Sequence, residues 1–423
     1  MTQNSPRAVS QIKWPRAIGW ALYDFANTIY SAVVVSFAIA LHVKEFTGVE
    51  KYTFLTAATS MGLGGLVMPF IGEYADRTGG SKHLLFFFTA LCCAACSAIT
   101  GAYQAWMILV LYFLANFAYN ACFPLYDSLL PLVSPPSRRG LISGLGVGIG
   151  YAGVAFSLPI AMFVTHLYRP IAPSHPLTPL FTLAGVLFLL FSLPLFILVP
   201  ERPANPPIPK PVAVLKTAYK RTVATILRLP RRKSIFLFLI GNFLCVDALN
   251  ATIIGYAPYV KHVLGLSLQT VMFWMIPFAI SALIMGIIGG RLSDRYGSRP
   301  IFLSAGVAFI IAVAVCGLSS SPWTFYPAFL IFGGYGLSTV WVAGRRMLLS
   351  LAPEGQIGKY FGLYNVGHKL SMIGMIFFGV LADIPFGGSP TGGYRVALLV
   401  QILTMGIGMV FVWKVNIHDS SRK

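Results

Sequence analysis

Long apolar runs separated by short polar segments occupy the chain from residue 17 to residue 413. Most of these runs reach the roughly 20 residues that an α-helix needs to cross the hydrocarbon core of a bilayer. Charged residues and clusters of proline and glycine mark where the runs end. The pattern predicts twelve transmembrane helices, at about residues 17–42, 53–72, 84–104, 106–133, 141–166, 178–199, 234–260, 267–290, 301–319, 323–352, 358–383 and 395–413.

The composition agrees with a membrane protein and excludes a water-soluble one. Of the 423 residues, 57% are hydrophobic and only 10% are charged, whereas soluble domains hold about 45–50% apolar and about 25% charged residues. Twelve spanning helices leave only short loops, so no catalytic domain fits outside the bilayer and we do not expect an enzyme. The six cysteines lie in apolar runs, and we expect no disulfide framework, no metal and no other cofactor.

The net charge of +19 would suggest nucleic-acid binding in a soluble protein. Its distribution points elsewhere, because 23 of the 31 Lys and Arg residues lie in the tails and loops on the side of the two termini and only five lie in the opposite loops. The positive-inside rule then places both termini in the cytoplasm. We expect a multi-pass protein of the cell (cytoplasmic or inner) membrane that contacts lipid and not nucleic acid.

An internal repeat organises the chain. The segments Gly72–Gly79 and Gly290–Gly297 share the pattern G-x-x-x-D-R-x-G and are offset by 218 residues. Three further pairs of matching positions keep this offset or differ from it by one residue. The repeat predicts two parallel six-helix halves, residues 1–200 and 234–423, joined by a cytoplasmic linker over residues 201–233.

The linker itself has two interpretations. Its first part is rich in proline, which favours an extended spacer. Between residues 212 and 229, apolar and basic residues alternate at helical spacing. This pattern is typical of an amphipathic helix on an anionic membrane surface, and a solvated linker is an equal alternative.

Two six-helix halves with this motif after helices 2 and 8 resemble the major facilitator superfamily over essentially the whole chain. The resemblance implies an all-α membrane protein of twelve transmembrane helices in two pseudo-symmetric six-helix bundles. It also implies that the motif latches a cytoplasmic gate: the glycine permits a tight exit from the helix, the aspartate accepts hydrogen bonds from helix N-terminal amides, and the arginine binds facing carbonyl or carboxylate groups. The first copy departs from the usual pattern at Tyr74. The residues implied for the gate are Gly72, Asp76, Arg77, Gly290, Asp294 and Arg295.

Within the superfamily, the segment Trp20–Asn27 is similar to the opening signature of the vacuole-effluxer-like family, which includes fungal vacuolar amino-acid exporters. Further matches lie in helices 4, 5, 7 and 11 and include Asp247 with Asn250 and Lys369. Ala248 departs from the pattern, which usually has glycine there. The resemblance covers both halves, but it names no substrate for this chain.

The segment Gly148–Gly153 spells the dinucleotide-binding fingerprint G-x-G-x-x-G. A fingerprint of that kind follows a β-strand, whereas this one lies inside a predicted spanning helix. The glycines are therefore predicted to allow close helix packing.

Six residues that lie well inside the predicted helices carry charge in water, and each such charge in a bilayer costs at least about 2.5–3.5 kcal/mol unless it faces a cavity or a partner. None of the six lies in helices 3, 6, 9 or 12, which the superfamily architecture makes peripheral. The six residues are Asp24, Asp127, Asp247, Arg345, Arg346 and Lys369. The predicted substrate and proton path consists of Asp24, Asn27, Asp127, Asp247, Asn250, Arg345, His368 and Lys369.

Each of these residues has a functional and a structural interpretation. Asp24 either binds a substrate amine or a proton, or is a structural carboxylate near the inner interface. Asp247 lies near the predicted midplane, which favours a role in proton coupling. Lys369 is predicted to contact a substrate carboxylate or to form an internal ion pair, and His368 either relays protons or packs.

Asp127 and Arg345 differ by 218 residues, the offset of the repeat, and carry opposite charges at equivalent positions of helices 4 and 10. We expect them to pair when the cytoplasmic side closes and to separate when it opens. Exchanging the two residues should then recover transport relative to either single variant. In the alternative, Arg345 reaches the interface and local hydroxyl groups such as that of Ser128 hold Asp127. Arg346 is rotated by about 100° and is expected to pack elsewhere.

These features predict a secondary active transporter that moves a small zwitterionic metabolite, with an amino acid favoured, by alternating access with proton coupling. Export is favoured by analogy with the family. The alternative cargo is a small organic anion or an amphipathic drug-like compound. A membrane sensor or an intramembrane enzyme is the alternative from a different class, although neither an output domain nor a converging catalytic set is visible. We expect a monomer whose partners are its substrate, protons and membrane lipids.

Overall fold

The computed structural model of the chain describes residues 11–47, 51–171, 175–201, 211–266, 268–319, 321–353, 355–370, 372–382, 384–386 and 392–416. The regular elements of these residues are helices. Twelve segments among them are long and apolar enough to cross a membrane. The predicted fold class, an all-α protein with twelve spanning helices, is confirmed.

The first six spanning segments extend from Trp14 to Leu198. The first of them is built from three consecutive elements, because the π-helical segment η1 separates α1 from α2. The elements of this part are α1 (Trp14–Tyr30), η1 (Ser31–Ala38), α2 (Ile39–Thr47), α3 (Lys51–Thr78), α4 (Ser81–Ala98), η2 (Ile99–Gly101), α5 (Ala105–Ser128), α6 (Leu130–Val133), η3 (Pro136–Arg138), α7 (Arg139–Tyr168) and α8 (Pro179–Leu198).

The last six spanning segments extend from Lys233 to Trp413. A second π-helical segment, η5, interrupts the tenth span between α13 and α14. The elements of this part are α9 (Pro211–Arg228), η4 (Leu229–Arg231), α10 (Lys233–His262), α11 (Leu268–Tyr296), α12 (Ser298–Leu318), α13 (Pro322–Ala328), η5 (Phe329–Gly333), α14 (Gly334–Leu351), α15 (Ile357–Leu370), α16 (Met372–Ala382) and α17 (Gly392–Trp413).

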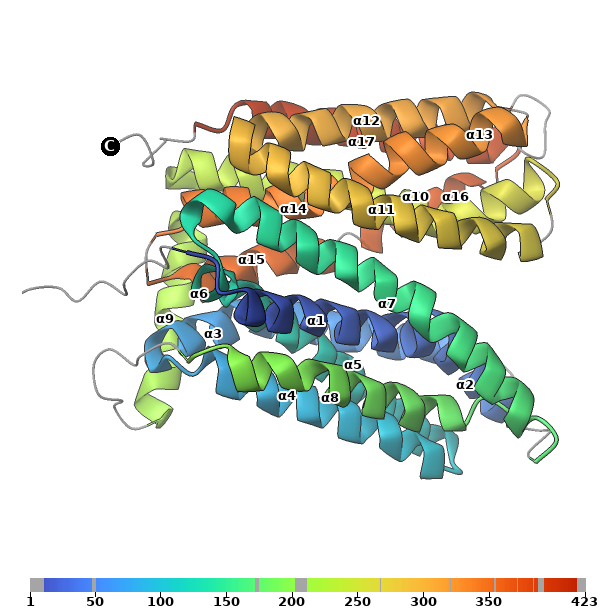
Figure 1. Cartoon of the computed structure of the whole chain (residues 1–423), viewed down its shortest axis with the longest axis horizontal. Helices are drawn as coiled ribbons and strands as arrows, with labels where there is room; N and C mark the ends of the chain where they lie inside the picture. The colour runs from blue at the N-terminus through green and yellow to red at the C-terminus, as the bar shows by residue number, and fades with distance from the viewer. Residues whose placement is uncertain are drawn as a thin grey trace, which may run out of the picture. The chain divides into compact units, whose positions relative to one another are not determined.

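The chain forms two compact units. The first comprises residues 1–142, 149–222 and 354–362, and the second comprises residues 143–148, 223–353 and 363–423. In the first unit α1 packs against α8, and α4 packs against both α5 and α8 (Figure 1). In the second unit α10 packs against α16 and α17, and α14 packs against α11 and α12.

The core of the first unit combines stacked aromatic rings with close helix contacts. The ring of Trp20 stacks on Tyr126 at 4.5 Å, and its indole Nε1 donates a hydrogen bond to the Tyr126 carbonyl oxygen at 3.1 Å. On α7, a Cβ atom at Gly153 would lie 2.7 Å from the Phe25 carbonyl oxygen, so only glycine allows α7 to approach α1 this closely. The prediction that the glycines of Gly148–Gly153 serve helix packing is confirmed at this position.

The helices that carry the repeated motif are longer than predicted. The apolar run predicts that helix 2 ends near residue 72, but α3 continues through Thr78 and the chain turns at Gly79, whose φ is +70°. The second copy behaves alike, since α11 continues through Tyr296 and Gly297 has a φ of +95°. The exit from each helix thus depends on the last glycine of the motif, Gly79 in the first copy and Gly297 in the second. The length of an apolar run matches the thickness of the hydrocarbon core of the bilayer. The helix itself can extend further into water, as long as its backbone hydrogen bonds are kept.

The linker contains the predicted helix. Residues 202–210 lie outside the described part of the chain, and α9 begins at Pro211, one residue before the predicted start. The ring of Tyr219 stacks on Phe70 of α3 with 5.3 Å between the centroids. Lys220 and Arg221, beside it, are exposed. Whether α9 lies on a lipid surface stays a prediction.

Candidate transport and gate residues

The aspartate of the first motif copy holds the start of α15. One carboxylate oxygen of Asp76 accepts a hydrogen bond from the backbone N–H of Gly358, and the other accepts one from the N–H of Lys359, both at 2.9 Å. Because α15 begins at Ile357, these amides belong to its first turn, where N–H groups have no partner in their own helix. The carboxylate also lies at the positive end of the helix dipole. Asp76 therefore fixes α15 through its backbone.

Gly72 makes this contact possible. A Cβ atom at Gly72 would lie 2.1 Å from the carbonyl oxygen of Gly358, a distance that no side chain tolerates. A Cβ atom at Gly358 would in turn lie 2.8 Å from the carbonyl oxygen of Gly72. The first glycine of the motif thus allows two backbones to cross closely.

Two charged residues that the sequence interpretation missed complete this cluster. Glu73 binds the Nε of Arg77 at 2.9 Å through one oxygen and the Nζ of Lys359 at 3.1 Å through the other. The side chains of Glu73 and Lys359 are only 4% and 3% exposed. Lys359 also donates to Oε1 of Gln356 at 2.7 Å. A signal was present in the sequence, because the position equivalent to Glu73 in the second copy is Arg291, of opposite charge.

The second motif copy forms a different ion pair. Asp294 accepts from the Nε of Arg346 at 2.9 Å, and their side chains are mostly buried. Arg346, which was expected to pack elsewhere than the Asp127–Arg345 pair, is a partner of this motif. Arg295 is exposed, and its guanidinium lies 5.2 Å from the centroid of the Tyr296 ring. Gly290 is buried in α11.

Asp247 is buried on α10 and contacts the backbone of α16. Its Oδ1 accepts a hydrogen bond from the N–H of Gly374 at 2.9 Å. A Cβ atom at position 374 would lie 2.2 Å from Oδ2, so the contact requires glycine. Asn250 is half-buried three residues further along α10.

His368 of α15 lies in an aromatic and polar environment in the second unit. Its Nε2 lies 3.1 Å from Nδ2 of Asn242, which donates if Nε2 carries no proton. The imidazole packs against Tyr364 at 4.2 Å and Trp341 at 4.5 Å. Asn242 was not among the predicted residues. Its Oδ1 is buried and has no hydrogen-bond partner within the described part of the chain.

In the first unit, Asp24 is half-buried on α1 and faces α7. A Cβ atom at Gly150 would lie 3.6 Å from its carboxylate carbon. Asn27 is buried one turn later, and its Nδ2 has no hydrogen-bond partner among the residues that the structure describes. The hydroxyl group of Thr28 donates to the Asp24 carbonyl oxygen at 2.7 Å.

The remaining predicted residues are distributed over both units. Asp127 is 1% exposed at the end of α5 in the first unit. Arg345 is 6% exposed on α14, and Lys369 is half-buried on α15, both in the second unit. The pairing of Asp127 with Arg345 stays a prediction from the repeat.

The second unit also contains an apolar cavity of about 90 Å³. Its lining includes Thr252 and Tyr256 of α10, Phe278 of α11 and Phe329 of η5. The rings of Tyr256 and Phe278 both stack on the ring of Phe329, with 4.5 Å and 4.2 Å between the centroids. None of the predicted path residues lines this cavity, so it offers space for apolar groups apart from the charged positions.

Comparisons with known proteins agree with this architecture. The sequence model described as Major Facilitator Superfamily matches residues 17–366 and 239–423. The chain is 25% identical over 409 residues to an uncharacterized MFS-type transporter, YxiO, of Bacillus subtilis, and the match covers 93% of each protein. It is 26% identical over 270 residues to the Autophagy-related protein 22-1 of Penicillium rubens, with 57% of this chain and 44% of that protein covered.

The fold also matches solved transporter structures. The structure of the superfamily transporter FucP in the outward conformation covers 95% of this chain with a TM-score of 0.71, at 13% sequence identity and over 98% of its own length. Such low identity shows the fold alone. Together with the twelve spanning helices and the duplicated motif, these matches show that the chain belongs to the major facilitator superfamily and is a multi-pass secondary transporter.

Proposed function

We propose that the protein moves a small zwitterionic metabolite, an amino acid in the first instance, by alternating access coupled to protons. The observation that carries this proposal is the presence of buried charges of both signs in spanning helices. Asp127 and Asp247 are 1% and 8% exposed, and Arg345 is 6% exposed. A zwitterion presents both an amine and a carboxylate, so carboxylate and guanidinium groups on the path would each find a partner on it.

The direction and the subfamily rest on resemblance. The opening signature Trp20–Asn27 is similar to that of the vacuole-effluxer-like family, and the match to the Penicillium rubens Autophagy-related protein 22-1 supports that assignment. We therefore propose that the chain belongs to this family and exports its substrate across the cell membrane, with both termini in the cytoplasm.

Asp247 is the proposed proton carrier. While charged, its carboxylate is stabilised by the Gly374 amide at 2.9 Å. Protonation removes the charge from this hydrogen bond, and a neutral acceptor binds an amide with roughly half the strength. The contact between α10 and α16 therefore weakens when a proton binds, which couples the protonation of one side chain to the packing of two helices.

The test is transport into proteoliposomes that contain only this protein. We expect radiolabelled amino acids to accumulate when a pH gradient is imposed, and to exchange across the membrane without a gradient. Asp247→Asn should abolish the accumulation driven by the gradient while counterflow exchange persists. Full accumulation by this variant would remove Asp247 from the mechanism, and protein-free vesicles provide the baseline.

The apolar cavity of the second unit favours one other cargo. Its aromatic lining suits the apolar part of an amphipathic organic anion. The same vesicles distinguish the two cargoes. Uptake of aromatic carboxylates in the absence of any amino-acid transport would replace the zwitterion with this second class.

A further inference from the structure

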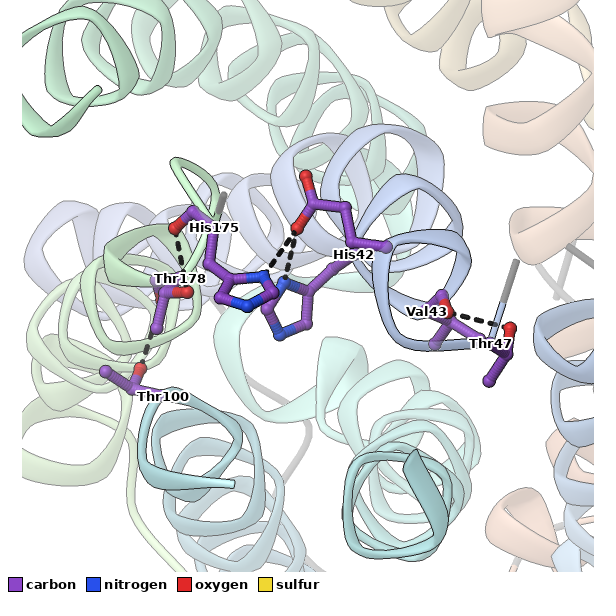
Figure 2. Close-up of polar contacts among 7 residues, drawn as sticks. His42, Val43, Thr47, Thr100, His175 and Thr178 are labelled. Carbon is purple, nitrogen blue, oxygen red and sulfur yellow. Dashed lines mark hydrogen bonds and ion pairs between the residues drawn. The ribbon is translucent and has the colours of Figure 1, made fainter. Parts of the chain in front are cut away.

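A carboxylate between two imidazoles lies in the first unit, apart from the residues described above. Oε2 of Glu45, on α2, is 3.4 Å from Nδ1 of His42 and 3.3 Å from Nδ1 of His175 (Figure 2). His42 lies one turn before Glu45 on the same helix, whereas His175 lies in the turn that precedes α8. The cluster thus joins segments 130 residues apart in the sequence.

The two imidazoles have different surroundings. His42 is 1% exposed, packs against Phe46 and Phe181, and makes no hydrogen bond through either ring nitrogen within the described residues. His175 has a side chain that is 41% exposed, and it stacks on Phe46 with 4.5 Å between the ring centroids. Solvent therefore reaches the ring of His175 but not that of His42.

The turn that carries His175 is tied to two further elements. The carbonyl oxygen of His175 accepts from the hydroxyl group of Thr178 at 3.0 Å. The carbonyl oxygen of Thr178 accepts from the hydroxyl group of Thr100, in η2, at 3.2 Å (Figure 2). Hydrogen bonds thus connect His175 through Thr178 to η2 at the end of the third span.

From this geometry we propose that Glu45 and His175 form a proton-binding latch, with His42 as its buried wall. Histidine is the side chain that changes charge between about pH 5 and pH 8. With a proton bound, the imidazolium and the carboxylate form a charge-assisted hydrogen bond that fastens the turn to α2. Without the proton, His175 keeps its stacking on Phe46, and its contact with the Glu45 carboxylate is weaker. The latch therefore closes as the pH falls and opens as it rises.

Two other charged residues line the same hollow as Glu45. Lys44 on α2 and Arg169 after α7 line the shallow hollow beside Glu45. Their attraction for the carboxylate is present in both protonation states of His175. The pH dependence of the latch must therefore come from the imidazole pair. The latch acts whatever the identity of the cargo.

The experiment measures how often the turn opens. Pro176→Cys is introduced in a background that lacks the native cysteines, and its rate of reaction with a thiol reagent is measured in purified full-length protein. Each rate is divided by the rate of the same protein with Glu45→Gln at the same pH, so that the intrinsic reactivity of the thiol cancels. At pH 5.5 we expect Glu45→Gln to speed labelling about two- to five-fold, the range expected for one partly exposed ion pair. At pH 8.0 the two proteins should react alike.

His175→Phe is the second variant, because phenylalanine keeps the stacking on Phe46 but binds no proton. It should give the same acceleration at pH 5.5, which protects the test against a folding defect of Glu45→Gln. Glu201→Gln is the matched control, since it removes the partner of His83, an exposed histidine 2.9 Å from that carboxylate. This control should leave labelling unchanged. Ratios that are equal at the two pH values, or a His175→Phe protein that labels like the parent, would overturn the latch.

Discussion

At the scale of single residues, the position of Asp247 requires a glycine at residue 374, because any side chain there would collide with the carboxylate. A methyl group at position 374 would overlap the carboxylate, since a Cβ atom there lies 2.2 Å from Oδ2. Gly374→Ala should therefore displace Asp247 and reproduce the loss of proton-driven accumulation expected for Asp247→Asn, at a cost of about 1–3 kcal/mol in stability.

The matched control for this substitution lies on the same helix. Gly379 of α16 has no atoms within 4 Å of its ideal Cβ position, so Gly379→Ala adds the same methyl group without a collision. This variant should transport like the parent. If both alanine variants accumulate substrate normally in proteoliposomes, the contact between Asp247 and the Gly374 amide has no role in coupling.

Glu73 and Lys359 form a buried ion pair, whose contribution to the stability of the protein depends on both partners. Glu73→Leu leaves the ammonium group of a 3% exposed lysine without its carboxylate, which should destabilise the protein by about 3–5 kcal/mol. Adding Lys359→Met removes the stranded charge and should recover most of this loss. Thermal unfolding of the purified variants measures both effects, and additive losses in the double variant would show that the pair is not coupled.

At the scale of elements, the crossing of α3 and α15 depends on Gly72. Gly72→Ala should push the helices apart, weaken the hydrogen bonds to Asp76 and lower both the melting temperature and the transport rate. Gly62, on the same helix, has open space at its Cβ position. Gly62→Ala should therefore be neutral or stabilise the helix by up to about 1 kcal/mol, because glycine is a poor helix former. A melting temperature for Gly72→Ala equal to that of Gly62→Ala would contradict the close crossing.

The spanning helices were predictable from the sequence, and their partners were not. An apolar run of about 20 residues needs no tertiary information to be identified, so all twelve spans were found. The contacts that hold Asp76, Asp247 and His368 join residues separated by 126 to 283 positions. A periodic pattern in the sequence carries no information about contacts between such distant residues. Lys359 and Asn242 were therefore not predicted, although their partners Asp76 and His368 were.

At the scale of the whole molecule, the distribution of basic residues predicts the sides of the membrane. Positions 210 and 388 lie outside the described residues, so this expectation rests on charge alone. Single cysteines at residues 51 and 388, in a background without the native six, should react with an impermeant thiol reagent in intact cells, and one at residue 210 should react only after permeabilisation. Labelling of residue 210 in intact cells would reverse the assigned orientation.

The π-helical segment η5 has a consequence for how the chain length can vary. A π-turn holds one residue more than the α-turn it replaces, because its hydrogen bonds run from residue i to residue i+5. Removing one residue between Phe329 and Gly333 can be absorbed by reversion to an α-helix, which keeps α13 and α14 in their mutual register. Removing one residue from within α14 has no such compensation and turns every position beyond it by about 100°. In a library of single-residue deletions within the tenth span, deletions in η5 should therefore be tolerated. In those variants the side chain of Arg345, on α14, should keep its orientation.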